Sequence, residues 1–381
     1  MKRAPIWDIG WIFLVTRILL IIVTYFGYIL LTQEKYSGTA ISIPTFIDTW
    51  QQWDAKIYVQ IARSGYQPPY YNLAFFPLFP LLIALPARLL GNNSYFIIGM
   101  LLSNAALLGS LFLLYQLAVE AAGEQVARRT VLYLCIFPTA FFFFTAYNES
   151  LFLLLTLGVF LSFRRQRWWL AGLLGMLAAL TRNTGVMLCA PFLYELWLAR
   201  ESVLASKKRL CAGILPILLI PLGTLLYCLY NWQITGNPLT FATVQAHWSR
   251  QLSAPWQAFV QTFFELFLHQ PFGSFNQVHI LIDITATITF IILVILGRKQ
   301  LRTSYTIWGA LLLLSFLISP STGQRDALIS SRRFVLEVFP AFITLAILSI
   351  KHPRLHQTLL WAFPALLATL SLLFVMGKWM V

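Results

Sequence analysis

Long apolar runs constrain this chain more than any other feature of its sequence. Runs such as SYFIIGMLLSNAALLGSLFLLYQLA and CAGILPILLIPLGTLLYCLY recur along the whole length. A helix needs about 20 apolar residues to cross a bilayer, and continuous runs favour helices over a β-barrel. Hydrophobic residues make up 59% of the chain and charged residues only 10%, whereas about 25% of a soluble globule is charged. The sequence therefore predicts an all-α polytopic membrane protein.

The positive charge indicates how the chain crosses the membrane. The formal net charge is +14, and the basic residues gather in the short gaps between apolar runs. Such clusters typically lie on the cytoplasmic side, so this placement argues against nucleic-acid binding. With every cluster on that side, about eleven spans of suitable length follow. We expect them at roughly 10–32, 94–119, 130–147, 149–163, 168–181, 184–199, 211–231, 280–297, 304–319, 334–350 and 357–378.

This threading leaves two large outer loops, at about 33–93 and 232–279. The stretch AFFPLFPLLIALPARLL in the first loop is expected to be juxtamembrane or re-entrant, because a full span there would invert every later loop. Its three prolines favour a broken, surface-lying segment. The first apolar run is too long for a cleaved signal peptide, and the snorkelling of Arg17 to the interface accounts for its charge. Without repeats or a soluble domain, residues 1–381 are expected to form a single integral membrane domain.

Ionisable residues at the outer ends of the spans are the candidates for function, because such groups are costly at membrane depth. Asp54 follows Trp53 in the first outer loop, Glu149 lies in TAYNESLF, and Arg182 interrupts an apolar hairpin. The later outer residues of this kind are His247, Arg250, His269, His279, Asp283, Arg325, Asp326, Arg332 and Arg333. Acids and arginines from distant parts of the chain are thus predicted to meet at one membrane face.

Each candidate also has a purely structural interpretation. Asp54 can cap a turn or helix, and Glu149 can begin a helix whose dipole suits its charge. Arg332 and Arg333 can be interfacial anchors, and aromatic side chains are expected at interfaces in any case. The outer histidines lack metal-ligand spacing. The cysteines all lie in apolar runs, so neither a metal site nor a disulfide framework is expected: Cys135, Cys189, Cys211 and Cys228.

The order of several short motifs resembles one known family. QWDAKIYVQIARSGY is followed by AFFPLFPLL, SNAALL, FPTAFFFFTAYNESLFLLL and TRNTG. This series closely resembles the GPI mannosyltransferase 2 (PIG-V-like) family, in particular its bacterial members, which belong with the GT-C type of integral membrane glycosyltransferases. The resemblance covers about the first half of the chain. Further on, TGNPLTFATVQAHWSR and SRRFVLEVFP look like the bacterial branch.

The resemblance implies a reaction. Such enzymes transfer a sugar, with inversion, from a polyprenyl-phosphate sugar to an acceptor hydroxyl at the outer membrane face. It implies that the key acid is Asp54, and it adds weight to Glu149 through the match at Tyr147, Glu149 and Ser150. Eukaryotic members carry acidic residues between GY and AFFP, whereas residues 67–72 here have none. Because bacteria generally lack GPI, the acceptor stays open between a glycolipid, a cell-wall polymer and a protein. Mannose as the transferred sugar is implied only by the name of the family.

The chemistry of this transfer requires two kinds of group. A carboxylate can take the proton of the acceptor hydroxyl, which contributes about 10²- to 10⁴-fold. The leaving lipid phosphate is anionic and is suited by arginine, so no cofactor or divalent metal is expected. The candidates for phosphate binding are Arg332, Arg333 and Arg182, with Arg250 and Arg325 behind them. The candidates for substrate binding are Trp53, Tyr58, Tyr66, Tyr147, Asn148, His247 and Arg250.

Two other classes of function stay open. A transporter or flippase of lipid-linked sugars is also polytopic, although it should show internal repeats and mid-membrane polar residues, which we do not find. A non-catalytic subunit of a glycosylation complex is the third reading, but it gives no reason for acids and arginines to converge. The leading prediction is therefore a glycosyltransferase of the bacterial inner membrane, with its active site on the extracytoplasmic face.

Overall fold

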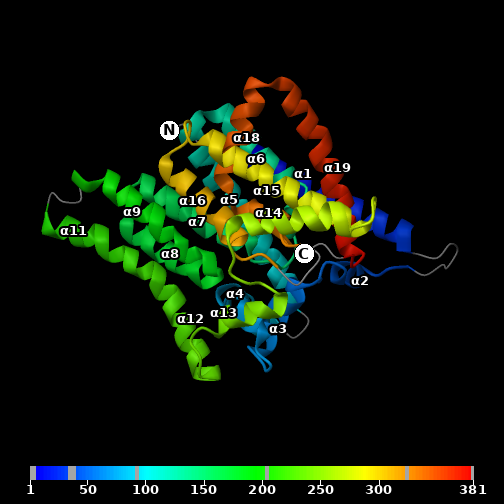
Figure 1. The fold of residues 1–381 in the computed structure, drawn as a ribbon, viewed down its shortest axis with the longest axis horizontal. Helices are drawn as coiled ribbons and strands as arrows, with labels where there is room; N and C mark the ends of the chain where they lie inside the picture. The colour runs from blue at the N-terminus through cyan, green and yellow to red at the C-terminus, as the bar shows by residue number, and fades with distance from the viewer. Residues whose placement is uncertain (1–5, 33–39, 91–93, 202–205, 322–325, 379–381) are drawn as a thin grey trace. The chain divides into compact units, whose positions relative to one another are not determined.

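The computed structural model describes residues 6–32, 40–90, 94–201, 206–321 and 326–378, and these residues are almost entirely helical (Figure 1). No β-strand forms within the described ranges, and Arg250 and Ser321 make an isolated antiparallel bridge. The all-α fold class predicted from the apolar runs is confirmed.

The chain forms two compact units, and neither is a continuous stretch of sequence. Unit 1 comprises Met1–Arg63, Pro80–Leu151 and Leu345–Val381, and unit 2 comprises Ser64–Phe79 and Phe152–Thr344. The single domain expected over residues 1–381 stays a prediction.

Unit 1 is built around a pair of long helices and a helical hairpin. α1 lies against α19, where Gly27 of α1 meets the side chain of Leu372 (Figure 1). α5 and α6 form the hairpin, and Gly123 between them has a φ of +88°, which glycine adopts without strain. The helices that lie wholly or mostly in unit 1 are α1 (Ile6–Thr32), α2 (Ile43–Asp48), α3 (Asp54–Ser64), α4 (Leu78–Leu90), α5 (Tyr95–Ala122), α6 (Glu124–Ile136), a 3-10 turn (Ala140–Phe143), α18 (Phe339–Lys351) and α19 (Pro353–Val375).

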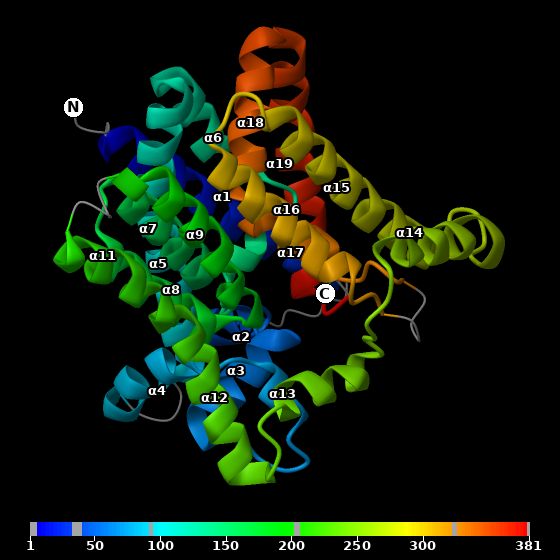
Figure 2. The same ribbon diagram turned by 60° about the vertical axis from the view of Figure 1, so that its left-hand side comes forward.

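Unit 2 contains the remaining helices. α14 and α15 lie side by side and are joined by a turn at Gly273, whose φ is +75° (Figure 2). The helices that lie wholly or mostly in this unit are α7 (Glu149–Arg164), α8 (Trp168–Thr181), α9 (Cys189–Leu198), α11 (Lys207–Ile214), α12 (Leu219–Thr235), α13 (Thr240–Thr243), α14 (Pro255–Phe264), α15 (Phe275–Gly297), α16 (Thr303–Leu317) and α17 (Ser331–Phe334). Its single-turn elements are Tyr71–Ala74, Asn183–Leu188, Leu215–Leu218, Val244–Trp248, Glu265–His269 and Val335–Glu337.

Five helices in the described part of the chain are long and apolar enough to cross a membrane. They are Trp7–Thr32, Tyr95–Ala122, Cys211–Thr235, Phe275–Gly297 and Pro353–Val375. A sixth is present if Ser331–Glu337 and Phe339–Lys351, bent by 82°, count as one span. The other predicted spans contain shorter helices. α7, for example, has 16 residues and a length of about 24 Å, whereas the hydrocarbon core is about 30 Å thick. The total of about eleven spans therefore stays a prediction.

The proline-rich stretch at residues 74–90 is more regular than predicted. Leu78–Leu90 forms the continuous helix α4, with Pro80 in its first turn and Pro86 inside it. Proline is tolerated in a first turn because the amide there has no partner within the helix. The predicted break is confined to residues 75–77, between the 3-10 turn Tyr71–Ala74 and α4, whereas Pro80 and Pro86 do not interrupt the helix. A helix of 13 residues is about 20 Å long, which is too short to span and agrees with a juxtamembrane or re-entrant position.

Candidate active site

Asp54 is the first residue of α3 and is half-buried in unit 1. Trp53, directly before it, has a φ of +42°, a region that bulky side chains rarely adopt. Such strain persists only where surrounding contacts hold the backbone, and it occurs often at functional sites. The turn that presents Asp54 is therefore expected to be held from outside α3.

Two hydroxyl groups from the TAYNES motif hold this turn. Thr145 Oγ1 donates to the backbone oxygen of Trp50 at 2.7 Å, and the phenol of Tyr147 donates to that of Gln52 at 3.2 Å. Thr145 and Tyr147 are fully buried, and of the two bonds that of Thr145 is buried while that of Tyr147 is partly buried. The QWD motif and the TAYNES motif are thereby joined directly.

The SNAALL motif in α5 holds the other end of this loop. Ser103 Oγ donates to the backbone oxygen of Tyr147 at 2.8 Å, and Asn104 Nδ2 donates to that of Phe144 at the same distance. Buried backbone oxygens in a loop need such partners. Three motifs that are distant in sequence therefore form one hydrogen-bonded assembly beneath Asp54.

Phe374 of α19 completes the packing around this turn. Its ring centroid lies 5.0 Å from that of Trp53 and 5.9 Å from that of Trp50. Offset and edge-on aromatic contacts of this kind stabilise by about 0.5–1.5 kcal/mol beyond the area that they bury. The other rings in contact with Phe374 are those of Phe141, Phe142 and Tyr147.

Glu149 lies deeper than Asp54. It is the first residue of α7 and is fully buried, as is the neighbouring Ser150. Asn148 and Tyr58 are also buried. The position of Glu149 fits the structural reading, in which an acid begins a helix at the positive end of its dipole. Of the acids considered for unit 1, Asp54 is the more accessible one.

Tyr66 and His247 belong to unit 2, where they flank the 3-10 turn Tyr71–Ala74. The Tyr66 hydroxyl donates to the backbone oxygen of Phe75 at 2.6 Å, and burial raises the pKa of Tyr66 well above its usual range. Tyr227 of α12 donates to Leu73 O at 2.7 Å. The ring of His247 is exposed and stacks on Tyr71, with centroids 4.4 Å apart. These contacts fasten the start of the AFFPLFP stretch to α12.

Three arginines gather around one aromatic ring in unit 2. The guanidinium carbons of Arg182, Arg250 and Arg333 lie 5.0, 5.6 and 5.0 Å from the ring centroid of Phe334. Arg182 also forms an ion pair of 2.6 Å with the buried Glu337. We call Arg182, Arg250 and Arg333 the arginine cluster. It brings together three cations that are up to about 150 residues apart in sequence.

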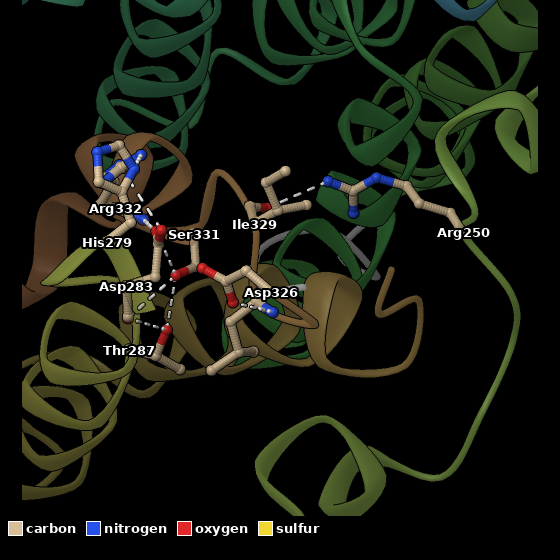
Figure 3. Close-up of polar contacts among 9 residues, drawn as sticks. Arg250, His279, Asp283, Thr287, Asp326, Ile329, Ser331 and Arg332 are labelled. Carbon is tan, nitrogen blue, oxygen red and sulfur yellow. Dashed lines mark hydrogen bonds and ion pairs between the residues drawn. The ribbon is translucent and has the colours of Figure 1, made fainter. Parts of the chain in front are cut away.

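Arg332 takes a different direction from its neighbour Arg333. Its guanidinium reaches Asp283 of α15, with 3.6 Å between Nε and Oδ2, and donates to Nδ1 of His279 at 3.0 Å (Figure 3). Arg250 donates to the backbone oxygens of Ser319 and Ile329 at 3.1 and 3.4 Å. Arg325 lies outside the described residues. Of the two adjacent arginines that the sequence proposes for phosphate binding, Arg333 is in the arginine cluster, whereas Arg332 is bound to α15.

Sequence reasoning missed the residues that hold these groups in place. They are Ser103, Asn104, Thr145, Phe334 and Glu337. All of them lie inside SNAALL, TAYNES or SRRFVLEVFP, so their place within those motifs was the available signal. In the described part of the chain, no group of three or more His, Cys, Asp or Glu residues could hold a metal ion.

Comparison with known proteins identifies relatives of this chain. GPI alpha-1,6-mannosyltransferase 2 of Rattus norvegicus is 35% identical over 145 residues, which cover 36% of this chain and 29% of the rat protein. The human protein of the same name is 31% identical over 148 residues, again 29% of its length. The matched segment thus spans under a third of these relatives.

The fold has a counterpart among solved structures. ArnT from Cupriavidus metallidurans, solved with undecaprenyl phosphate bound, superposes with a TM-score of 0.52 at 16% identity, covering 92% of this chain and 62% of ArnT. The same protein in the apo state gives the same values. The all-helical architecture is therefore that of the GT-C type. The model of the mannosyltransferase (PIG-V) family matches residues 38–240. With more than half of its residues in that match, this chain belongs to the mannosyltransferase (PIG-V) family.

Proposed function

We propose that this protein is a membrane glycosyltransferase that moves a sugar from a polyprenyl-phosphate sugar to an acceptor hydroxyl. The sugar is mannose, in keeping with the family, and the reaction takes place at the extracytoplasmic face of a bacterial inner membrane. The observation that carries the proposal is the turn at Asp54, which three family-like motifs hold in a strained conformation. A fold counterpart solved with undecaprenyl phosphate supports the choice of donor.

Asp54 acts as the general base in this scheme. Its carboxylate takes the proton of the acceptor hydroxyl as the acceptor oxygen bonds to the anomeric carbon of the sugar. The bond between that carbon and the phosphate oxygen breaks on the opposite side, so the configuration inverts. Glu149, being fully buried, is assigned to holding the TAYNES loop, with a direct catalytic part as the alternative. Trp53, beside the acid, is assigned to substrate binding.

The arginine cluster is proposed to hold the donor phosphate. A sugar-phosphate diester carries one negative charge, and the released polyprenyl phosphate carries nearly two at neutral pH. Guanidinium groups therefore bind the departing phosphate more strongly than the intact donor, and such differential binding accelerates the reaction. Arg182, Arg250 and Arg333 bring three guanidinium groups around Phe334. The forked donors of guanidinium groups suit the oxygens of a phosphate.

The proposal is tested with purified protein in nanodiscs. The protein is supplied with a short-chain polyprenyl-phosphate mannose, and release of polyprenyl phosphate is followed, with water taking the place of the acceptor hydroxyl that Asp54 deprotonates. We expect Asp54→Asn to lower this release at least about 100-fold, the typical effect of removing a general base. Asp48→Asn is the matched control, because Asp48 is an exposed carboxylate in the same unit, six residues earlier. It should release polyprenyl phosphate at the wild-type rate.

The outcomes separate the possible errors. Equal release from wild type and Asp54→Asn would remove Asp54 from the mechanism and turn attention to Glu149. Binding of the donor without release by either protein would contradict the transferase and favour a carrier of lipid-linked sugars. Equal losses in the Asp54 and Asp48 variants would show a general effect of charge rather than base catalysis.

A further inference from the structure

A buried carboxylate stands beside the arginine cluster, and the reaction proposed above does not use it. Asp283 lies in α15 and is fully buried. Its Oδ1 accepts a hydrogen bond from the backbone N–H of Arg332 at 2.9 Å and one from Ser331 Oγ at 3.1 Å (Figure 3). Ser331 and Arg332 immediately precede Arg333 and Phe334. Asp283 therefore fixes the backbone from which a member of the cluster and its central ring project.

The backbone at this point needs such an anchor. Ser330 has a φ of +70°, which a side chain other than glycine rarely adopts. Thr287, one turn after Asp283 on α15, forms a 2.9 Å hydrogen bond with the Ser331 hydroxyl. A strained residue persists where neighbouring contacts over-determine its conformation. Here those contacts come from one face of α15.

Arg332 adds a second attachment to the same helix. Its guanidinium donates to Nδ1 of His279, so that nitrogen accepts and the imidazole proton lies on Nε2. Its Nε lies 3.6 Å from Asp283 Oδ2. Arg332 is only 1% exposed. Its guanidinium therefore contacts residues of α15 rather than solvent. The two adjacent arginines therefore differ in their contacts. Arg332 binds residues of α15, whereas Arg333 belongs to the arginine cluster.

A second acid faces the same carboxylate. Asp326 lies in the turn before Ser330, and its Oδ1 accepts from the backbone N–H of Leu328 at 2.9 Å. Burial and the neighbouring Asp283 carboxylate raise the pKa of Asp326 to about 8. At neutral pH the Asp326 carboxyl is therefore protonated and can donate to Asp283. The charged and titratable groups around this pair are Arg332 and His279, and Arg250 reaches the same turn through Ile329 O.

We propose that Asp283 is a positioning residue, which holds Ser331 and Arg332 on α15 so that Arg333 and Phe334 stay within the arginine cluster. The inference rests on the proposed phosphate-binding function of that cluster. Asp283 acts through Arg333 and does not itself touch the phosphate. An acid in this place is needed because it accepts the Arg332 backbone N–H and Ser331 hydroxyl together and also balances the Arg332 guanidinium.

The test measures binding of farnesyl phosphate to the full-length protein in nanodiscs. Asp283→Ala should weaken binding about 10-fold or more, because the Arg332 backbone N–H loses its acceptor and the Arg332 guanidinium loses its counter-charge. Asp283→Asn keeps an acceptor oxygen and should weaken it less. Glu265→Gln is the matched control, a carboxylate in the same unit that pairs with His269 at 3.0 Å, and its binding should equal that of wild type.

A double-mutant cycle separates positioning from general damage. Arg333→Gln removes the group through which Asp283 is proposed to act. If Asp283 acts through Arg333, Asp283→Asn should weaken binding only a little further in protein that already carries Arg333→Gln. The free-energy effects of substitutions at coupled residues are not additive. Fully additive losses would overturn the proposal. The cycle uses Asp283→Asn, so it stands even where Asp283→Ala fails to fold.

Failure of this inference can be told from failure of the proposed function. Wild-type protein that does not bind farnesyl phosphate would overturn the phosphate site, and the positioning role with it. Wild-type binding that is matched by folded Asp283→Ala and Asp283→Asn variants would overturn the positioning role alone. Inorganic phosphate as a second probe should show the same order of variants, because the cluster recognises the phosphate rather than the lipid.

Discussion

The buried side chain of Arg17 supplies hydrogen-bond donors to backbone oxygens at the end of a neighbouring helix. It lies in α1, is only 5% exposed, and donates to the backbone oxygens of Cys135 and Ala140 at 3.3 and 3.5 Å. α6 ends at Ile136, ahead of Pro138, and the last carbonyls of a helix have no partner within it. Snorkelling, which the sequence suggested for Arg17, is therefore wrong. The arginine caps a helix end inside the unit.

We expect Arg17→Leu to lower the free energy of unfolding by about 1–3 kcal/mol, because it leaves buried carbonyls without donors. Thermal unfolding in detergent measures the change. Arg128→Leu is the control, since Arg128 forms an exposed ion pair with Asp8, and such pairs contribute about 0–1 kcal/mol. Equal effects of the two substitutions would contradict the capping role.

Thr145 connects residue-scale geometry to catalysis. Thr145→Val keeps the shape of the side chain but removes the donor to Trp50 O, so the turn that carries Asp54 should loosen. We expect kcat to fall about 10-fold or more, because small misplacements of a catalytic group are costly. Thr145→Ser retains the hydroxyl and should recover most of the activity. If the valine and serine variants were equally active, this hydrogen bond would have no part in positioning Asp54.

At the scale of elements, α8 packs closely through glycines against α12 and against the 3-10 turn Leu215–Leu218 before it. A Cβ added at Gly172 would overlap the backbone oxygen of Pro216, and one added at Gly223 would lie 2.5 Å from Met176 O. Small residues let membrane helices pack backbone to backbone. This contact sets the course of α12, which carries Tyr227 to the turn at residues 71–74.

Gly223→Ala should therefore destabilise unit 2 by about 1–3 kcal/mol, the usual cost of overpacking. Thermal unfolding by tryptophan fluorescence is the measurement. Gly10→Ala is the control, because nothing lies within 4 Å of a Cβ at that helical position, and alanine is the better helix former there. A Gly223 variant as stable as the Gly10 variant would show that the two helices can separate freely.

The turn before α17 should make the protein sensitive to alkaline pH. A carboxyl whose pKa is raised on folding, as that of Asp326 is to about 8, binds its proton more tightly in the folded state. Its contribution to stability is complete below the unfolded pKa of about 4 and is lost as pH rises through about 8. Farnesyl phosphate affinity should also fall above pH 8, when two carboxylates face each other.

Melting temperatures of wild type and Asp326→Asn between pH 6 and 9.5 test this expectation. The asparagine cannot ionise, so the difference between the two proteins should grow up to about pH 8 and then level off, once the wild-type carboxyl has ionised in the folded state as well. Parallel curves would mean that Asp326 keeps one protonation state throughout the range.

At the scale of the whole molecule, the fold class could be predicted from the sequence, whereas the roles of the candidate site residues stay predictions. Continuous apolar runs require helices in a bilayer, and the motifs placed Asp54, Glu149 and the arginines in order. The sequence did not reveal that Arg332 and Arg333 point to different partners, because the partners of Arg332, Asp283 and His279, are distant from it in sequence. Nor could it separate long spans from shorter helices, since apolar composition continues through breaks such as Pro138.

The threading itself gives a prediction for the whole molecule. Gln60 is exposed on α3, near Asp54, and Arg165 is exposed in the connection between α7 and α8. In a background without reactive native cysteines, Gln60→Cys should react with an impermeant maleimide in intact cells. Arg165→Cys should react only after the membrane is opened, because basic connections stay cytoplasmic. Reversed labelling would place Asp54 on the cytoplasmic side and overturn the proposed face of the reaction.

The contact of Phe374 with Trp53 also bears on biosynthesis. The ribosome makes the QWD turn early and α19 late, so the ring that packs against Trp53 arrives only after nearly all other helices have been inserted. A polypeptide released before α19 contains Asp54 but lacks this support. The turn that carries Asp54 is therefore completed only when translation has passed Phe374, and we expect prematurely terminated products to be inactive even though they carry every proposed catalytic residue.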